Sequence, residues 1–219
     1  HIGVEPVRSD YYLCDQALPS VTSCKDLGIT VCNTLAPGAH VASVVVTANQ
    51  RVNLIFRCFV SRDVGLLLRA FITYVRPILE YNTVIWSPYS KGDIERIERV
   101  QRRFTKRLSG LHSLTYCQRL KKLALPTLEL RRLHSDLVMC YKIVFGLVRL
   151  RFDDFFAFSP VTITRGHKYK LYVKHSSGVR RHFFSERVVA PWNSMPASVD
   201  FSSLNRFKIS IKNIDFSRF

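Results

Sequence analysis

Apolar and polar positions follow two different periods, one near the start of the chain and another through the remainder. Residues 11–14 and 17–18 form two short runs rich in apolar side chains, which predict a hairpin with its turn at residues 15–16. Residues 25–31 are rich in β-branched and apolar side chains and predict a third strand. The Ala-Pro-Gly break at residues 36–38 then ends this extended region.

From residue 39 onward the apolar spacing becomes helical. Apolar side chains recur at intervals of three and four residues up to about Val60, which predicts a first helix. Capping residues and breaks at proline or glycine predict six more helices, at residues 64–79 (kinked or ended by Pro77), 93–108, 116–123, 127–148, 184–193 and 204–211. The fold is therefore expected to be mainly α, with a short N-terminal β-hairpin or strand element, a helical bundle and a small mixed C-terminal region.

Charge is the property of the composition that changes this picture most. The 219 residues carry 33 Lys and Arg against 16 Asp and Glu, a formal net charge of +17. The excess comes from residues 91–132, with 12 basic and 4 acidic residues, and from residues 165–219, with 11 and 3. Since 47% of the residues are hydrophobic, intrinsic disorder is excluded. A folded chain this basic is typical of proteins that bind a polyanion such as nucleic acid.

The cysteines and the longest uncharged run argue against two other classes of protein. The six cysteines lack the paired spacing of zinc sites and predict reduced, mostly buried thiols, with no metal site. Residues 27–50 are uncharged, but Asn33 and Pro37 interrupt them, so no membrane span is expected. An intracellular location, nuclear and/or cytoplasmic, follows. The chain begins at His1 without a leader and is expected to be a piece of a longer product.

Residues 94–108 combine the apolar period with the charge. At 100° per residue, the apolar side chains fall in a sector about 120° wide and the basic ones lie opposite. The apolar set is Ile94, Ile97, Val100, Phe104 and Leu108, and the basic set is Arg96, Arg99, Arg102, Arg103, Lys106 and Arg107. Glu95 and Glu98 are spaced to pair with Arg99 and Arg102. Because guanidinium groups match phosphate oxygens, the pattern favours nucleic-acid contact over a merely solvated face or a membrane-surface helix.

The sequence predicts no catalytic residues. Residues 152–154 (Phe-Asp-Asp) are similar to the metal-binding turn of nucleotide polymerases, but that turn requires flanking apolar strands and a third carboxylate. Here a helix-terminating loop is expected instead. His134, Ser135 and Asp136 are neighbours in sequence, which is no evidence for a triad, and no phosphate-binding glycine loop is present.

Seven further segments are informative when they are taken together and in order. They are residues 25–29 (KDLGI) after the hairpin, 66–86 (LLLRAFITYVRPILEYNTVIW), 94–108 (IERIERVQRRFTKRL), 125–132 (LPTLELRR), 164–167 (TRGH), 183–193 (FFSERVVAPWN) and 204–208 (LNRFK). This set resembles the non-LTR (LINE-type) retrotransposon reverse transcriptases of the jockey and chicken-repeat kind. The resemblance covers nearly the whole chain. It departs from the family at the hairpin turn, where Asp-Gln stands in place of an Asn-Gly type of turn.

The resemblance implies that the chain is the C-terminal part of such a polymerase. Residues 1–35 would be the palm-edge and primer-grip β remnant, residues 36–110 the helical thumb-like region, and residues 111–219 a C-terminal helical region with an extended basic arm. Tyr11, Tyr12 and Leu13 would be primer-grip-like. The metal-binding aspartates of the family lie upstream, so Mg²⁺ is expected only in the palm that this chain lacks. Phe184, Val188 and Trp192 are expected to be core residues.

The expected function is non-catalytic binding of a template–primer duplex, either RNA/DNA or DNA, beside the missing palm and fingers. The expected contacts are the basic set of residues 96–107 and a second surface on the alternating residues 168–174 and beyond, namely Lys168, Lys170, Arg180 and Arg181. One alternative is a sequence-specific DNA-binding regulator that uses residues 93–108 as its recognition helix. Another is an inert, degenerate relic of a mobile element.

Overall fold

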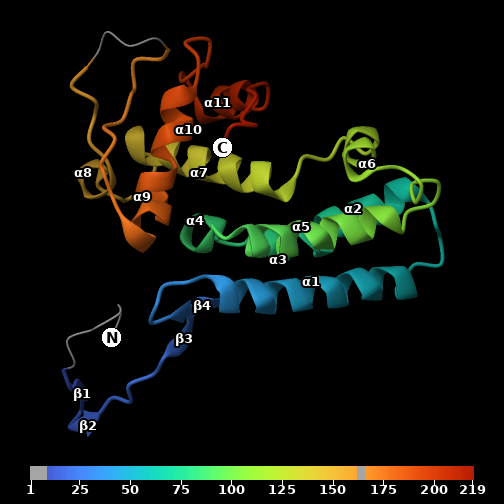
Figure 1. The fold of residues 1–219 in the computed structure, drawn as a ribbon, viewed down its shortest axis with the longest axis horizontal. Helices are drawn as coiled ribbons and strands as arrows, with labels where there is room; N and C mark the ends of the chain where they lie inside the picture. The colour runs from blue at the N-terminus through green and yellow to red at the C-terminus, as the bar shows by residue number, and fades with distance from the viewer. Residues whose placement is uncertain (1–8, 162–165) are drawn as a thin grey trace. The chain divides into compact units, whose positions relative to one another are not determined.

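The computed structural model describes residues 9–161 and 166–219, and within them the chain is mainly helical with short N-terminal strand pairs, as the sequence predicts (Figure 1). The chain forms two compact units. The first contains the described residues up to Tyr81 together with residues 86–125, and the second contains residues 82–85 and the described residues from Pro126 onward. Of the segment at residues 164–167 that carries part of the family resemblance, residues 164 and 165 lie outside the described residues. The three functional regions expected from the sequence stay a prediction.

The predicted N-terminal hairpin is present, but its turn lies one residue earlier than expected. Strand β1 (Tyr12–Leu13) pairs antiparallel with β2 (Gln16–Ala17), so that Cys14 and Asp15 form the two-residue turn. Their φ angles are 48° and 61°, the left-handed values of a type I′ turn, which matches the twist of a hairpin. Asp15 tolerates this conformation better than most residues, which explains how the turn forms without Asn-Gly.

The prediction of one strand over residues 25–31 is wrong, because these residues form a second hairpin. Strand β3 (Ser23–Asp26) pairs antiparallel with β4 (Ile29–Cys32). Leu27 and Gly28, with φ angles of 44° and 85°, make the turn. Leu27 resembles a strand residue in the sequence, but in the turn its side chain is 79% exposed.

Helix α1 (Gly38–Cys58) confirms the first predicted helix, and the next predicted helix is divided in the structure. Helix α2 (Val64–Tyr74) begins at Asp63, whose carboxylate accepts a hydrogen bond from the Leu66 amide at 2.7 Å. The chain breaks at Val75 and continues as α3 (Arg76–Glu80), in which Pro77 occupies the first turn, followed by α4 (Thr83–Trp86). Pro77 is tolerated there because first-turn amides have no intrahelical acceptor.

Helices α5 (Lys91–Lys106) and α6 (Tyr116–Lys122) complete the first unit, and both carry strong N-terminal caps. Ser90 accepts a hydrogen bond from the Asp93 amide, and Thr115 forms a reciprocal capping box with Gln118. In the core, the ring of Phe104 on α5 stacks on Phe71 of α2 with centroids 4.4 Å apart and lies 5.6 Å from Phe56 of α1. This aromatic cluster joins the three long helices of the unit.

The second unit is built around α7 (Leu128–Val144), which five shorter elements follow within the described residues. They are α8 (Phe152–Phe155), a 3-10 helix η1 (Gly178–His182), α9 (Phe184–Arg187), α10 (Val189–Ser194) and α11 (Leu204–Ile211). Helix α7 ends four residues before the predicted position, because Gly146 (φ 66°) reverses the chain and the Leu147 amide bonds back to the Lys142 carbonyl.

Trp192 and Phe207 lie at the centre of the second core and are fully buried. The indole N–H of Trp192 donates to the Tyr169 carbonyl at 2.7 Å, and the hydroxyl of Tyr141 donates to the Phe201 carbonyl at 2.9 Å. Val188 is buried as well and Phe184 packs against this cluster, which confirms the predicted core role of this segment. The predicted single helix over residues 184–193 divides at Val188 into α9 and α10.

A buried ion pair ties residues 82–85 to the second unit. The guanidinium of Arg187 donates two hydrogen bonds to Asp136 of α7, at 2.8 and 2.9 Å, and a third to the Val84 carbonyl at 2.7 Å. Burial raises the pKa of Asp136, and the hydrogen bonds from Arg187 oppose that rise. Since one guanidinium holds both segments, residues 82–85 belong with α7 although they lie far from it in sequence.

Two buried histidines are held in their neutral form by backbone hydrogen bonds. His40 Nδ1 accepts from the Thr30 amide at 3.2 Å, and His167 Nδ1 accepts from the Tyr169 amide at 3.2 Å. His167 Nε2 lies 2.8 Å from the Trp192 carbonyl, as a donor in this tautomer. Burial lowers the pKa of both rings. Protonation at Nδ1 would also break each amide hydrogen bond.

We expect the free energy of unfolding to fall as the pH drops from about 7.5 to about 5.5, through the unfolded-state pKa of about 6.5. In this range the two histidines bind protons in the unfolded chain but not in the folded one. Each of them therefore lowers the free energy of unfolding by up to about 1.4 kcal/mol for one pH unit. Urea unfolding at the two pH values measures the loss. The double variant His40→Gln and His167→Gln should show a smaller loss, whereas His112→Gln, at an exposed site, should match the wild type. A wild-type stability that is constant over this range would contradict the assignment.

Candidate nucleic-acid interface

Helix α5 presents one face to the core and the opposite face to solvent. Ile97, Val100 and Phe104 are at most 1% exposed, as the apolar period predicts. The buried side is wider than the sequence indicates, because Gln101 and Thr105 are also fully buried. Since this side is held by packing, the opposite side of the helix has a fixed direction.

A polar network between α5 and α6 accounts for the wider buried face. The hydroxyl of Tyr116 donates to the buried carboxylate of Glu98 and accepts from Gln101 Nε2 at 3.1 Å. Burial, followed by the hydrogen bond to Glu98, raises the pKa of Tyr116. Arg119 is 4% exposed and donates from Nε to the hydroxyl of Thr105 at 3.1 Å. Because these contacts depend on α6, the period of α5 alone could not reveal them.

The predicted basic set lies on the solvent side of α5. Five of its six side chains are exposed and Arg102 is half-buried: the exposed ones are Arg96, Arg99, Arg103, Lys106 and Arg107. Glu95 pairs with Arg102, two helical turns away, rather than with the expected Arg99. The half-buried Arg102 therefore contributes less free charge than its neighbours.

Most of this positive charge is not neutralised locally. Arg96 pairs with Asp93 at 3.2 Å, one turn before it. No carboxylate of residues 9–161 and 166–219 pairs with Arg99, Arg103, Lys106 or Arg107. The charges of these four exposed cations therefore remain available to a polyanion.

Arg107 is fixed in place by the end of α1, and a further arginine reaches the same point. The Arg107 guanidinium carbon lies 3.9 Å from the centroid of the Phe56 ring, and its Nη1 donates to Asn53 Oδ1 at 3.0 Å. Arg62, in the linker after α1, donates from Nη1 to the Phe56 carbonyl at 3.0 Å and to the Phe59 carbonyl at 3.3 Å. Arg62 is not among the contacts predicted from the sequence, since it lies outside every basic cluster and no local pattern links it to α5.

The second predicted surface is only partly exposed. The alternation of residues 168–174 predicts an exposed strand or an extended arm, but Leu171 is 1% exposed and makes only an isolated bridge to Phe158. Lys170 is drawn inward: its ammonium donates to the Asn193 carbonyl, and burial lowers its pKa. Lys168 is exposed, and so are Arg180 and Arg181 in η1. These residues belong to the second unit, whereas α5 belongs to the first.

The primer-grip-like residues Tyr11, Tyr12 and Leu13 lie in and next to β1, and all three side chains are more than 60% exposed. Exposure of this kind leaves them available for contact with another molecule. Their assignment to a primer grip rests on the family resemblance and stays a prediction.

The acidic pair Asp153 and Asp154 lies in the single-turn helix α8, and neither described neighbouring segment is a strand. Within the described part of the chain, no three His, Cys, Asp or Glu side chains converge as a metal-ion ligand set would.

All six cysteines are free thiols, but the expectation that most are buried is wrong, since Cys140 alone is buried. Among residues 9–161 and 166–219, none of the helices combines the length and apolar character needed to cross a membrane.

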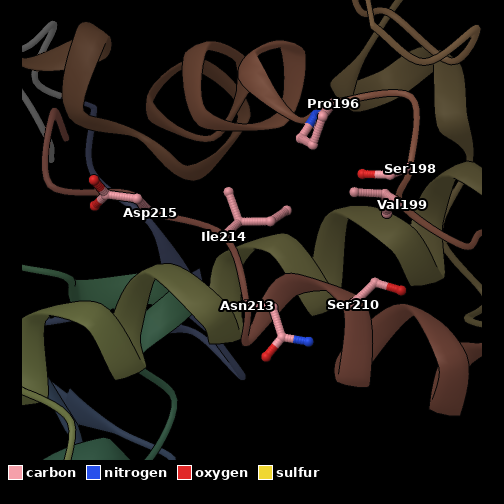
Figure 2. Close-up of a pocket in the computed structure, with 7 residues that line it drawn as sticks. All are labelled: Pro196, Ser198, Val199, Ser210, Asn213, Ile214 and Asp215. Atoms are coloured by element: carbon pink, nitrogen blue, oxygen red, sulfur yellow. The ribbon is translucent and has the colours of Figure 1, made fainter.

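A pocket in the second unit is lined by two segments, residues 196–199 and residues 210–215 (Figure 2). The hydroxyl of Ser210 donates to the Arg206 carbonyl and accepts from the Asp200 amide, and Asp215 accepts from the Ser217 amide. The side chains of Ser210 and Asp215 in the pocket therefore bond to the local backbone. The charged side chain among its lining residues is the acidic Asp215, which does not suit a polyanionic ligand.

Comparison with known proteins brings no relative: no protein-family model matches the chain, and neither a curated protein nor a solved structure matches it. The resemblance to non-LTR reverse transcriptases therefore rests on the sequence segments themselves.

Replacing Tyr116 with Phe should lower the free energy of unfolding by about 1–3 kcal/mol. The replacement removes the hydroxyl that donates to the buried Glu98 and accepts from Gln101. Chemical denaturation measures the change. Tyr74→Phe is the matched control, since Tyr74 is 59% exposed and its replacement should leave stability unchanged. Equal stability of the two variants would show that the network does not hold α6 against α5.

Proposed function

We propose that this chain binds a nucleic-acid duplex without regard to sequence, as the non-catalytic, template–primer-holding part of an RNA-directed DNA polymerase of the non-LTR retrotransposon type. The observation that carries the proposal is the solvent face of α5, where Arg99, Arg103, Lys106 and Arg107 are exposed and have no carboxylate partner among the described residues. The order of the resembling sequence segments supports the choice of polymerase family.

The chemistry of this face suits phosphate better than any other common partner. Each guanidinium offers several N–H donors in a planar fork, and each neutralised phosphate also releases counterions. The buried side of α5 is packed against Phe71 and Phe56, so the cations stand on a rigid support. A rigid row of cations loses less conformational entropy on binding than a mobile tail does.

The same helix is poorly equipped to read bases, which disfavours a sequence-specific regulator. Base recognition in the major groove depends on side chains such as Asn and Gln as well as Arg. Gln101 is the one amide side chain of α5, and it is fully buried. Arginine and lysine contacts to phosphate fix position without reading sequence.

The proposed function needs a second part that supplies the chemistry. In a polymerase of this kind the palm would hold Mg²⁺ and the reacting ends, and the fingers would complete the cleft. A chain with this role would work inside the cell, in the nucleus or the cytoplasm. The alternative of an inert relic predicts that the chain does not unfold cooperatively, which the urea titration described above also tests.

The double variant Arg99→Glu and Lys106→Glu should weaken binding to a primer–template duplex and make its dependence on salt shallower. Loss of two phosphate contacts should reduce the slope of log affinity against log salt by about 1.8. Fluorescence anisotropy with a labelled duplex over a salt series measures both quantities.

The matched control is Lys208→Glu with Lys212→Glu, which removes the same charge from two exposed positions at α11. The control variant should retain most of the slope of log affinity against log salt. If both double variants lose affinity equally, only the net charge of the chain matters, and the proposed α5 surface is refuted.

The purified chain should not extend a primer on an RNA or DNA template in the presence of Mg²⁺, because the proposal assigns catalysis to the upstream palm. A gel-based extension assay with a complete polymerase as positive control tests this. Magnesium-dependent extension that copurifies with the chain would overturn the non-catalytic assignment.

A further inference from the structure

We propose that Arg62, Arg103 and Arg107 form a clamp for one phosphate group of a polynucleotide backbone, at the point where the C-terminal end of α1 meets α5. This inference rests on the proposed function and deepens it. It adds to the interface a residue from the α1–α2 linker and turns one end of the basic row into a defined binding site.

Two members of the clamp, Arg62 and Arg107, both contact Phe56. Arg62 binds the backbone carbonyl of Phe56 at 3.0 Å, and the Arg107 guanidinium covers the ring of the same residue at 3.9 Å. Arg103 lies one helical turn before Arg107 on the exposed side of α5. Two guanidinium groups therefore converge on one residue, and a third lies beside them.

The contacts that hold these arginines leave donors free. Arg62 uses Nη1 for the two carbonyls at the end of α1, and Arg107 uses Nη1 for Asn53 Oδ1. A guanidinium has five N–H donors. Since both side chains use only Nη1, their Nε and Nη2 groups have no hydrogen-bond partner among the described residues. Anchored forks of this kind are pre-organised for the tetrahedral oxygens of a phosphate.

The site also has an unbalanced charge, which favours an anion. No carboxylate in the described part of the chain pairs with any of the three arginines. Burial lowers the pKa of Arg107, and the positive charges of Arg103 and Arg62 lower it further. Like charges that are held close together repel, and a bound phosphate relieves that repulsion.

The position of the clamp favours a backbone phosphate over an acidic peptide. Arg99 and Lys106 continue the row of cations along α5, so that a strand held at the clamp would meet further positive charges. A polynucleotide supplies an anion at each residue, and a row of fixed cations matches that repeat.

Four single variants, measured with the labelled duplex over a salt series, test the clamp. Arg62→Ala and Arg107→Lys should weaken binding, the first by about tenfold at low salt, and Arg62→Ala should reduce the salt slope by about 0.9. Arg62→Lys should keep the slope, because it keeps the charge, but lose affinity because it lacks the fork. The matched control is Arg51→Ala, since Arg51 is an exposed arginine about 160° around α1 from Asn53.

The outcomes separate the clamp from the proposed function. If Arg99→Glu with Lys106→Glu weakens binding but Arg62→Ala matches Arg51→Ala, the α5 surface stands and the clamp is refuted. If Arg62→Lys binds like the wild type, the fork geometry is refuted. If polyglutamate competes as well as the duplex, a polynucleotide is the wrong ligand.

A second measurement does not depend on duplex binding or on the folding of a variant. Pyrophosphate, titrated into the wild-type chain, should shift the NMR signals of the Nε–H groups of Arg62 and Arg107 together, and the Arg51 signal should stay in place. If neither clamp signal moves, the site does not bind phosphate, whether or not the chain binds a duplex. If the signals move but the duplex does not bind, the clamp stands as an anion site and the proposed function fails.

Discussion

The contact between Phe104 and the rings of Phe71 and Phe56 is the constraint on which the rest of the first unit depends. It joins α5 to α2 and α1 at the same point and removes three large apolar side chains from water. A helix with one side fixed in this way cannot rotate, so its other side has a defined direction. The exposed arginines and Lys106 acquire a common orientation because the opposite side of their helix is buried.

Polar contacts determine which acidic side chains of α5 remain free on its surface. The hydrogen bonds of Tyr116 to Glu98 and Gln101 remove one carboxylate of α5 from its surface, and Arg102 engages a second, Glu95. These two carboxylates are thereby occupied, and the third, Asp93, pairs with Arg96, so that none of them neutralises Arg99, Arg103 or Lys106. This arrangement concentrates positive charge on the solvent face, which is the property that the proposed duplex binding requires.

Contacts with the end of α1 hold two arginines of the surface in fixed positions. Asn53 and Phe56 hold Arg107, and the carbonyls of Phe56 and Phe59 hold Arg62. Carbonyls at a helix C-terminus attract cations because they carry the negative end of the helix dipole. The same physical feature that ends α1 therefore fixes Arg62 in place, and the interface combines two elements distant in sequence.

The sequence by itself determined the features that depend on local spacing. The apolar period identified the buried residues Ile97, Val100 and Phe104, the helix predicted from residue 64 begins there after the Asp63 cap, and the basic side of α5 followed from the apolar period. Only the tertiary structure decided which partner each polar group meets. Gln101 was buried by α6, Lys170 was drawn to Asn193, and Arg62 and Arg107 both came into contact with Phe56. Helical period and capping depend on neighbours within a few residues, whereas these partners lie up to about fifty residues apart and meet only when the chain packs.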